Sequence, residues 1–223
     1  MPKVKQHIYK RIAKRAKAIL PVSHFLKKGM QDCGLKGSYS ILPNIVDLPV
    51  VTSEKNKEYT FIVVSDIVDK IKNISGIVSA FQDIKNLDRE FKLIIVGDGP
   101  DFHDIETLVK TNPAGINLLG RLSNKDALSE ISKAHCLVVN SNIETFSVVC
   151  IEARAQGLQV IATDCGGPSE YADEFTFTTP VNNIKVLKKQ LLNAPLNNNI
   201  SHRNIQEFSK QQIGSSLLEL YES

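Results

Sequence analysis

The amino-acid sequence predicts an α/β protein whose parallel β-sheet is flanked by helices. From residue 59 onward, short apolar runs alternate with longer segments that carry apolar residues at helical spacing. The apolar runs are continuous, which is typical of strands that a parallel sheet buries on both faces. Each run stops at polar or glycine residues. This alternation of strand and helix favours a parallel sheet.

The elements are expected in a regular order. The predicted strands cover residues 60–65, 92–96, 116–119, 136–140 and 159–163. The predicted helices between them cover residues 73–81, 101–110, 126–134 and 146–156. Gly157 is expected to end the last of these helices, because glycine readily adopts the conformation that follows a helix. A final helical pattern occupies residues 200–221.

The first 31 residues differ in charge from the rest of the chain. They hold nine Lys or Arg and no acid, whereas the remainder holds 18 basic and 24 acidic residues. Residues 4–20 are predicted to form a basic helix with a thin apolar stripe. Residues 20–23 are predicted as a short strand, after which Ser23 opens a second helix.

Two interpretations of the basic helix are open. It either touches an anionic membrane surface or packs its apolar stripe against protein that is absent from this chain. Nucleic acid is not expected as a partner, because aromatic residues interleaved with the charges are nearly missing.

Composition sets further bounds. At 223 residues the chain is long enough for one sizeable core. No window approaches an apolar membrane span, and the basic start lacks the apolar region of a secretory signal. We therefore expect a cytoplasmic protein, with a peripheral position at the inner face of the membrane as the alternative. The four cysteines and five histidines lack metal-ligand spacing, so no metal site is expected.

Two glutamates separated by seven residues mark the candidate functional site. Glu144 falls in the loop at the carboxyl end of the strand predicted at residues 136–140, the sheet edge where open α/β sheets bind their ligands. Glu152 lies further along the predicted helix, about 12 Å away if the whole span is helical. The alternative interpretation is that Glu144 only stabilises the helix start and Glu152 lies on a solvated helix face.

Between these glutamates the predicted helix start offers unpaired backbone N–H groups, on Phe146, Ser147 and Val148. Such groups can hold a phosphate. Two acceptor carboxylates around an anion site suit a molecule with hydroxyl groups at both ends and phosphates in the middle. A nucleotide-sugar is such a molecule.

The segment from Glu144 to Glu170, E-T-F-S-V-V-C-I-E-A-R-A-Q-G-L-Q-V-I-A-T-D-C-G-G-P-S-E, resembles the signature of retaining GT-B glycosyltransferases of family 4. The usual form of that signature is E-G-F-G-x-x-x-x-E-A-x-A-x-G-x-P-V-[IV]-A-[ST]-x-x-G-G-x-x-E. Residues 41–47 resemble the V-I-P-N-G-V-D segment of the family, and residues 97–100 resemble its G-x-G-P turn. The resemblance covers nearly the whole chain, but only about the second half of a family member.

The resemblance implies a Rossmann-like sheet domain, which is the C-terminal half of a GT-B fold, after a basic helical segment. Residues 1–40 would be the remnant of an N-terminal domain and linker. Residues 41–199 would be the nucleotide-sugar-binding domain, and residues 200–223 the C-terminal crossover helix. Because the N-terminal acceptor domain is expected to be missing, this chain alone is expected to show no turnover.

The resemblance also assigns roles by position. Glu144 would hold hydroxyl groups of the donor sugar near the reacting carbon, and Glu152 would bind the ribose hydroxyls. Lys72 would stabilise the departing diphosphate together with the helix N-terminus. The further donor-binding residues implied are Thr145, Phe146, Ser147, Val148, Asp66, Gly97, Arg121 and Leu122. Gly97 is expected mainly as a turn residue.

The reaction implied is a retaining, metal-independent transfer of a hexosyl-type sugar. Its donor is a nucleoside-diphosphate sugar, which serves as substrate, so no separate cofactor is expected. The acceptor implied is a glycan or a lipid-linked molecule.

Asp66 departs from the family pattern. Ser65-Asp66-Ile67 stands where the family has G-R-L, and Lys72 stands at the place of the family lysine. A carboxylate repels a diphosphate, and a lone lysine supplies a point charge in place of an arginine fork. The alternative function is therefore a degenerate, non-catalytic module that binds a nucleotide-sugar or a partner.

Overall fold

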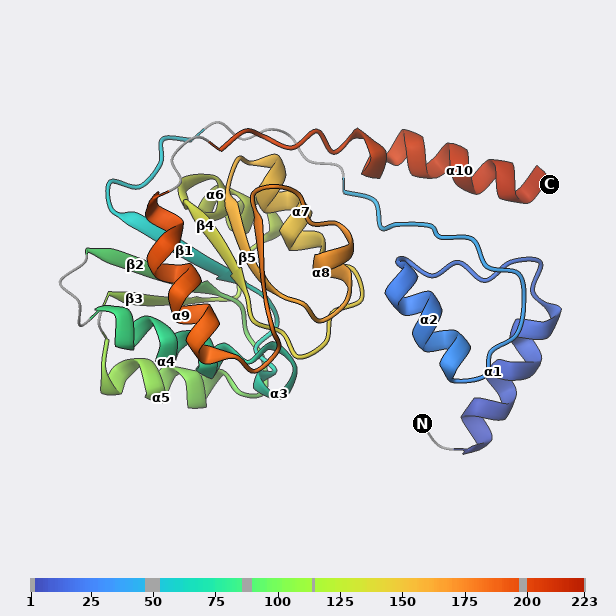
Figure 1. Cartoon of the computed structure of the whole chain (residues 1–223), viewed down its shortest axis with the longest axis horizontal. Coiled ribbons are helices and arrows are strands. Elements are labelled where there is room, and N and C mark those ends of the chain that lie inside the picture. The colour runs from blue at the N-terminus through green and yellow to red at the C-terminus, as the bar shows by residue number, and fades with distance from the viewer. Residues whose placement is uncertain (1–2, 47–52, 86–89, 114, 197–199, 223) are drawn as a thin grey trace.

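The computed structural model describes residues 3–46, 53–85, 90–113, 115–196 and 200–222 (Figure 1). The domain boundary expected at residue 199 and Asp47 of the 41–47 motif lie outside the described residues. The division of the chain into three parts stays a prediction.

The described residues contain a six-stranded sheet in which every neighbouring pair of strands is parallel. Its strands are β1 (Tyr59–Val64), β2 (Phe91–Val96), β3 (Ile116–Gly120), β4 (Cys136–Val139), β5 (Gln159–Thr163) and β6 (Thr176–Thr179). The strand order is β3-β2-β1-β4-β5-β6. The predicted α/β class and parallel sheet are confirmed.

The strand order reverses between β1 and β4. After β1, the strands β2 and β3 add successively to one side of β1. The next strand, β4, lies on the other side of β1, where Phe61 pairs with Cys136. Loops that follow β1 and β4 therefore leave the sheet in different directions. Such a reversal opens a crevice at the carboxyl edge of the sheet, where ligands of open α/β folds bind.

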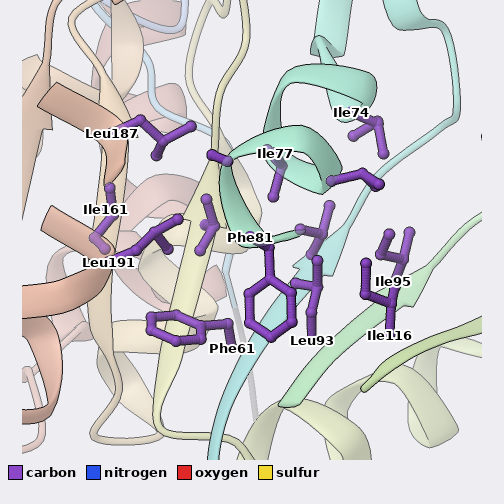
Figure 2. Packing of buried hydrophobic residues seen from close by; sticks show 14 of the residues in the cluster. Phe61, Ile74, Ile77, Phe81, Leu93, Ile95, Ile116, Ile161, Leu187 and Leu191 are labelled. Atoms are coloured by element: carbon purple, nitrogen blue, oxygen red, sulfur yellow. The ribbon is translucent and has the colours of Figure 1, made fainter. Parts of the chain in front are cut away.

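Helices cover both faces of the sheet (Figure 1). One face packs against α4 (Ile74–Lys85), α5 (Phe102–Thr111) and α9 (Ile184–Asn193), and the other against α6 (Asn124–Lys133) and α7 (Val148–Ala155). Successive residues of a strand point to opposite faces, so Phe61 enters one core and Ile62 the other, both without exposed surface. Burial on both faces explains the continuously apolar strand sequences. Figure 2 shows the first core, in which Phe81 of α4 and Leu191 of α9 pack over Phe61 and Leu93.

The helix expected at residues 73–81 is confirmed as α4, and a separate short helix, α3 (Asp69–Lys72), precedes it. Asn73 adopts a left-handed conformation with φ 49°, which ends α3 and lets α4 begin at Ile74. Asparagine tolerates this conformation better than most residues because its short polar side chain bonds locally. The break turns α3 across the carboxyl edge of the sheet.

The helix expected at residues 146–156 begins later than predicted. Ser147 has φ 67° and is the N-cap residue, so α7 starts at Val148. Gly157 follows this helix with φ 73°, as expected. The strand predicted at residues 20–23 is wrong, because these residues form no strand and only the preceding Ile19 makes an isolated bridge, with Tyr39.

The last part of the chain is less helical than its pattern predicted. Residues 200–205 lack regular structure, and they lead into η2 (Gln206–Phe208) and α10 (Lys210–Glu222). A further 3-10 turn, η1 (Ala194–Leu196), follows α9. We call residues 200–208 the C-terminal strap. Phe208 is buried in a small core with Val46, Phe146 and Ile151, so the strap is packed against α7.

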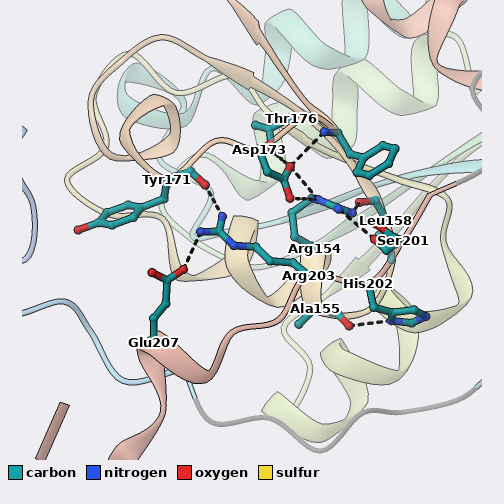
Figure 3. A network of polar contacts seen from close by, with 11 residues as sticks. Arg154, Ala155, Leu158, Tyr171, Asp173, Thr176, Ser201, His202, Arg203 and Glu207 are labelled. Carbon is teal, nitrogen blue, oxygen red and sulfur yellow. Dashed lines mark hydrogen bonds and ion pairs between the residues drawn. The ribbon is translucent and has the colours of Figure 1, made fainter. Parts of the chain in front are cut away.

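Two polar networks also hold the strap (Figure 3). Arg154 of α7 is 2% exposed and donates to both carboxylate oxygens of Asp173, at 2.8 and 3.0 Å, and to the carbonyl oxygen of Ser201 at 3.0 Å. Arg203 of the strap donates to the carbonyl oxygen of Tyr171 and to the carboxylate of Glu207. The strap is therefore bound to the sheet domain through buried as well as surface contacts.

The basic N-terminal segment forms α1 (Lys3–Arg15) and α2 (His24–Asp32), which lie beside the sheet domain in Figure 1. The apolar stripe of α1 includes Ile8, Tyr9 and Ile12, all about half exposed. Among the described residues, no helix is both long and apolar enough to cross a membrane.

Candidate active site

The candidate site lies where the loops after β1 and β4 leave the carboxyl edge of the sheet. Asn140 and Asn142 of the loop after β4 bind the turn that carries α3. The side-chain amide of Asn140 donates to the carbonyl oxygen of Asn73 at 3.2 Å. The backbone N–H of Asn142 donates to the carbonyl oxygen of Ile71 at 2.7 Å. These bonds fix α3 and the loop after β4 relative to each other.

Lys72 and Glu144 meet across this crevice. The Nζ atom of Lys72, in the last turn of α3, lies 2.5 Å from Oε2 of Glu144. Their side chains are 23% and 18% exposed, so the pair is shielded but reachable from solvent. The structure thus brings together the two predicted catalytic side chains, which are 72 positions apart in the sequence.

The Gly-Gly turn holds the loop of Glu144. Glu144 and Gly166 form a parallel bridge, and the backbone N–H of Gly167 donates to the carbonyl oxygen of Glu144 at 2.8 Å. A Cβ atom on Gly167 would lie 2.4 Å from the Cα atom of Phe146. Gly166 has φ 126°, which other residues rarely adopt. Both glycines of the turn are therefore required by the close approach and the backbone conformation. The turn then enters the short helix α8 (Gly167–Glu170).

A small cavity of about 20 Å³ adjoins the Lys72–Glu144 pair. It is lined by ends of β1 and β4, by Ser65 and Ser141, and by Ser147 and Val149 at the start of α7. The hydroxyl oxygens of Ser65 and Ser141 are buried and have no hydrogen-bond partner among the described residues. Buried polar atoms usually have partners, so these hydroxyl groups mark a place for a polar ligand or water.

The start of α7 offers backbone N–H donors at positions shifted from the prediction. Because the helix begins at Val148, the free N–H groups of its first turn are those of Val148 and Val149. The N–H of Cys150 already donates to the carbonyl oxygen of Ser147 at 3.1 Å. Val148 keeps the place predicted for it. The N–H groups of Phe146 and Ser147 do not belong to the helix, and the Phe146 side chain is a core residue.

Glu152 lies apart from this cavity. It is half-buried on α7 and does not line the space beside Lys72 and Glu144. Burial raises the pKa of Glu152. The alternative prediction of a fully solvated helix face for Glu152 is therefore wrong. Its proposed contact with ribose stays a prediction.

Asp66 and Arg121 form a surface ion pair at the same edge of the sheet. Asp66 follows β1 and Arg121 follows β3, and Nη2 of Arg121 lies 3.6 Å from Oδ1 of Asp66. The side chains are 74% and 68% exposed. Gly97 directly follows the intervening strand β2, and a Cβ atom there would lie 1.9 Å from the carbonyl oxygen of Ser65. Gly97 is thus required for the close approach of the backbone at Ser65. Leu122, which follows Arg121, packs against the core beside α6.

Sequence reasoning did not foresee the Asp66–Arg121 contact or the two unpartnered serines. The contact joins loops from two strands that are separated in the sheet by β2, and only the strand order brings them together. Ser65 is the last residue of one predicted strand and Ser141 directly follows another, which is a usable but weak signal. Burial raises the pKa of the nearby Cys150 thiol to about 12, so this cysteine is an inert core residue.

The strand order defines an open α/β protein, and the candidate site lies at its strand-order reversal. Residues 47–212 match the family described as "Glycosyl transferases group 1". The chain belongs to this family.

Two curated relatives illustrate the similarity. An uncharacterized glycosyltransferase of Methanocaldococcus jannaschii is 30% identical over 212 residues, which are 92% of this chain and 58% of that protein. N-acetyl-alpha-D-glucosaminyl L-malate synthase of Bacillus anthracis is 29% identical over 163 residues, which are 68% of this chain and 42% of that protein. The chain therefore spans between two fifths and three fifths of the length of these relatives.

A solved structure shows the same fold. TarM of S. aureus, in a crystal structure with Fondaparinux, alpha-GlcNAc-glycerol and UDP, superposes with a TM-score of 0.87 at 17% identity. The similarity covers 100% of this chain and 47% of TarM. At this identity the comparison shows the Rossmann-like α/β fold of glycosyltransferase structures.

Proposed function

We propose that this chain is the donor-binding half of a glycosyltransferase that takes a sugar from a nucleoside-diphosphate sugar. The observation that carries the proposal is the Lys72–Glu144 pair at the strand-order reversal. Membership of the group 1 family supports a transferase, and a structural neighbour that contains UDP supports the class of donor.

In the proposed mechanism, the diphosphate of the donor lies between Lys72 and the start of α7. The ammonium group of Lys72 and the free N–H groups of Val148 and Val149 stabilise the negative charge that develops on the departing diphosphate. Diphosphate binding competes with Glu144 for Lys72. The carboxylate of Glu144 is then free to accept hydrogen bonds from hydroxyl groups of the donor sugar.

The stereochemistry, base contacts and acceptor of the proposed reaction are inferred from the family resemblance. We propose that transfer proceeds with retention, through an oxocarbenium-like transition state attacked from the face that the diphosphate leaves, and without a metal ion. The resemblance supports the proposal that Arg121 and Leu122 contact the base of the nucleotide. The acceptor would be a glycan or a lipid-linked molecule, held by a domain outside this chain, and the exposed basic helix α1 would touch an anionic membrane beside it. Because the chain spans about half of its relatives, we expect donor binding without turnover.

Calorimetric titration with a panel of uridine and guanosine diphosphates and their sugars tests donor binding. We expect weak binding of one nucleotide series, and about tenfold weaker binding for Lys72→Gln, because the substitution removes a charge-assisted bond to phosphate. Lys110→Gln is the matched control, since Lys110 pairs with Glu106 on the distant helix α5. No binding of any nucleotide at millimolar concentration would contradict the proposal.

The Asp66–Arg121 pair favours a second candidate, a non-catalytic module derived from a transferase. Asp66 follows the cavity-lining Ser65 in the chain, and its carboxylate pairs with the guanidinium of Arg121. In the full-length protein, Asp66→Arg distinguishes the two functions. A gain of transfer activity on substitution supports the degenerate module, whereas a loss of activity shows that the aspartate has a positive role in a working enzyme.

A further inference from the structure

A second cavity, which is lined by basic residues, lies at the amino edge of the sheet, opposite the candidate active site. It has a volume of about 400 Å³, within the usual range for small-molecule sites. Its walls come from the segment before and at the start of β1, from the residue before β4, from the turn between α7 and β5, and from the C-terminal strap. The lining residues are Lys55, Lys57, Tyr59, His135, Gln156, Gly157, Ile200 and His202. None of these lining residues is acidic.

Lys55 and Lys57 place two ammonium groups at this cavity. Within the part of the chain that the structure describes, Nζ of Lys55 donates one hydrogen bond, to the carbonyl oxygen of Ala134 at 2.7 Å, which leaves two of its N–H groups for a ligand. Burial lowers the pKa of Lys55 to about 8, which still leaves the group charged at neutral pH. Lys55 as a whole residue is exposed, but the surroundings of its ammonium group disfavour the charged form, and a bound anion would offset this cost.

His135 adds a neutral donor whose proton position is fixed. Its Nδ1 atom accepts a hydrogen bond from the backbone N–H of Thr60 at 3.1 Å. The ring proton is therefore on Nε2, which is left to donate to a ligand. Tyr59 stacks on the imidazole with the ring centroids 4.8 Å apart, so the ring orientation is also fixed. Burial, followed by the charge of Lys55, lowers the pKa of His135 and keeps the ring neutral at pH 7.

The strap closes the cavity on its far side. Nδ1 of His202 lies 2.9 Å from the carbonyl oxygen of Ala155 and must carry a proton to donate to it. The preceding residue, Ser201, accepts the buried bond from Arg154. The cavity thus joins the amino ends of β1 and β4 to the strap.

We propose that this cavity is a second anion site that binds a phosphate-bearing small molecule. Lys55, Lys57 and the Nε2–H group of His135 supply donors from two strand ends, an arrangement that suits the several oxygens of a phosphate group. The remaining volume accommodates the body of a phosphomonoester. The bound ligand bridges the sheet and the strap, so it stabilises residues 200–208 against the sheet domain. The site is separate from the donor crevice and does not depend on the proposed function.

Nitrogen-detected NMR of the histidine rings, with inorganic phosphate as the probe, tests the proposal on the full chain. At pH 7 and constant ionic strength, we expect the His135 and His202 signals to shift and to saturate at millimolar phosphate, while the exposed His103 of α5 does not move. Hydrogen exchange of residues 200–208 should slow when phosphate is present.

Matched variants separate this site from the donor crevice. Lys55→Gln combined with Lys57→Gln should weaken phosphate binding at least about tenfold, because two charge-assisted donors are lost. Lys57→Gln alone should weaken binding measurably, and it guards against misfolding since Lys57 is exposed. Lys72→Gln should leave the shift of the His135 signals on addition of phosphate unchanged. Shifts that rise linearly without saturation, persist in the double variant or vanish in Lys72→Gln would each overturn the proposal, whatever the outcome of the nucleotide titrations.

Discussion

At the scale of single residues, the two site glutamates differ in what their surroundings do to a carboxylate. Glu144 has Lys72 at 2.5 Å, so its negative charge is compensated. Glu152 is half-buried, and burial raises its pKa without an opposite charge to offset it. A carboxylate that is buried without a partner is costly to the fold, and such costs are commonly found at binding sites.

Glu152→Gln should therefore stabilise the free protein while weakening nucleotide binding. The raised pKa means that the folded state binds the proton more tightly than the unfolded state, so the ionised Glu152 destabilises the fold at pH values above its folded pKa. The variant should gain up to about 1 kcal/mol at pH 7, and the difference should vanish at low pH, where Glu152 is protonated in both states. Urea denaturation at pH 4 and pH 7 measures the gain, and calorimetry measures the nucleotide affinity.

Glu130→Gln is the control for this substitution, because Glu130 is paired with Lys133 on the surface of α6. It should not gain stability with rising pH. A Glu152→Gln variant that is destabilised at pH 7 but binds nucleotide normally would indicate a structural role for Glu152.

At the scale of elements, α7 connects the candidate site to the strap. Its first turn faces the cavity beside Lys72, and its last turn carries Arg154, which holds Asp173 and Ser201 (Figure 3). The guanidinium of Arg154 also lies 4.8 Å from the ring of Phe175. A change at Arg154 therefore acts on the attachment of the strap as well as on the fold.

Arg154→Met should destabilise the protein by on the order of 3 kcal/mol, because it leaves the largely buried carboxylate of Asp173 without its cation. Burial opposes ionisation of Asp173, but the bonds from Arg154 and Thr176 outweigh it and lower the pKa. The stabilisation is therefore present above the unfolded pKa of the aspartate and is lost as the pH falls through the folded pKa. The cost of Arg154→Met at pH 7 should shrink at acidic pH.

Thermal and urea unfolding at several pH values measure this loss. Lys133→Met, which breaks the surface pair with Glu130, should cost less than about 1 kcal/mol. If Arg154→Met does not fold, Asp173→Asn replaces it, and its stability loss should likewise diminish with falling pH. A pH-independent loss would show that the pair acts through packing alone.

At the scale of the whole molecule, the sequence predicted the layers better than the connections between them. Continuous apolar runs identified β1 to β5 because burial on both faces requires them. The polar strand β6, T-F-T-T, was missed, since it lies at the sheet edge and carries no such run. The breaks at Asn73 and Ser147 were also missed, because a left-handed residue depends on tertiary contacts more than on the local pattern.

The candidate site was predictable to the extent that the family resemblance carried it. That resemblance placed Lys72 and Glu144 in one site, and the structure has them in contact. Spacing alone could not do so, because the contact depends on the strand order. The same order brings Arg121 to Asp66 and the basic residues to the amino-edge cavity, and neither was visible in the linear sequence.

The N-terminal segment also contacts the loop that carries Glu144 and the residues of α8. The hydroxyl group of Ser23 donates to the carbonyl oxygen of Thr145 at 2.6 Å, and the hydroxyl of Tyr171 donates to the carbonyl oxygen of Val22 at 2.9 Å. The carboxylate of Glu170 accepts hydrogen bonds from the backbone N–H groups of His24 at 2.7 Å and Phe25 at 3.1 Å, at the start of α2. Helix N-termini favour a negative charge in this position.

Glu170→Ala should therefore loosen α2 without unfolding the sheet domain. Loss of an acid at a helix N-terminus costs about 1 kcal/mol. Amides of residues 22–32 should consequently exchange several-fold faster, while amides of β1 and β4 keep their protection. Hydrogen exchange followed by mass spectrometry resolves the two regions. Glu174→Ala, which removes an exposed acid nearby, should leave both regions unchanged. Equal exchange of residues 22–32 in Glu170→Ala and the parent chain would mean that Ser23 and Tyr171 suffice to hold α2 against the site.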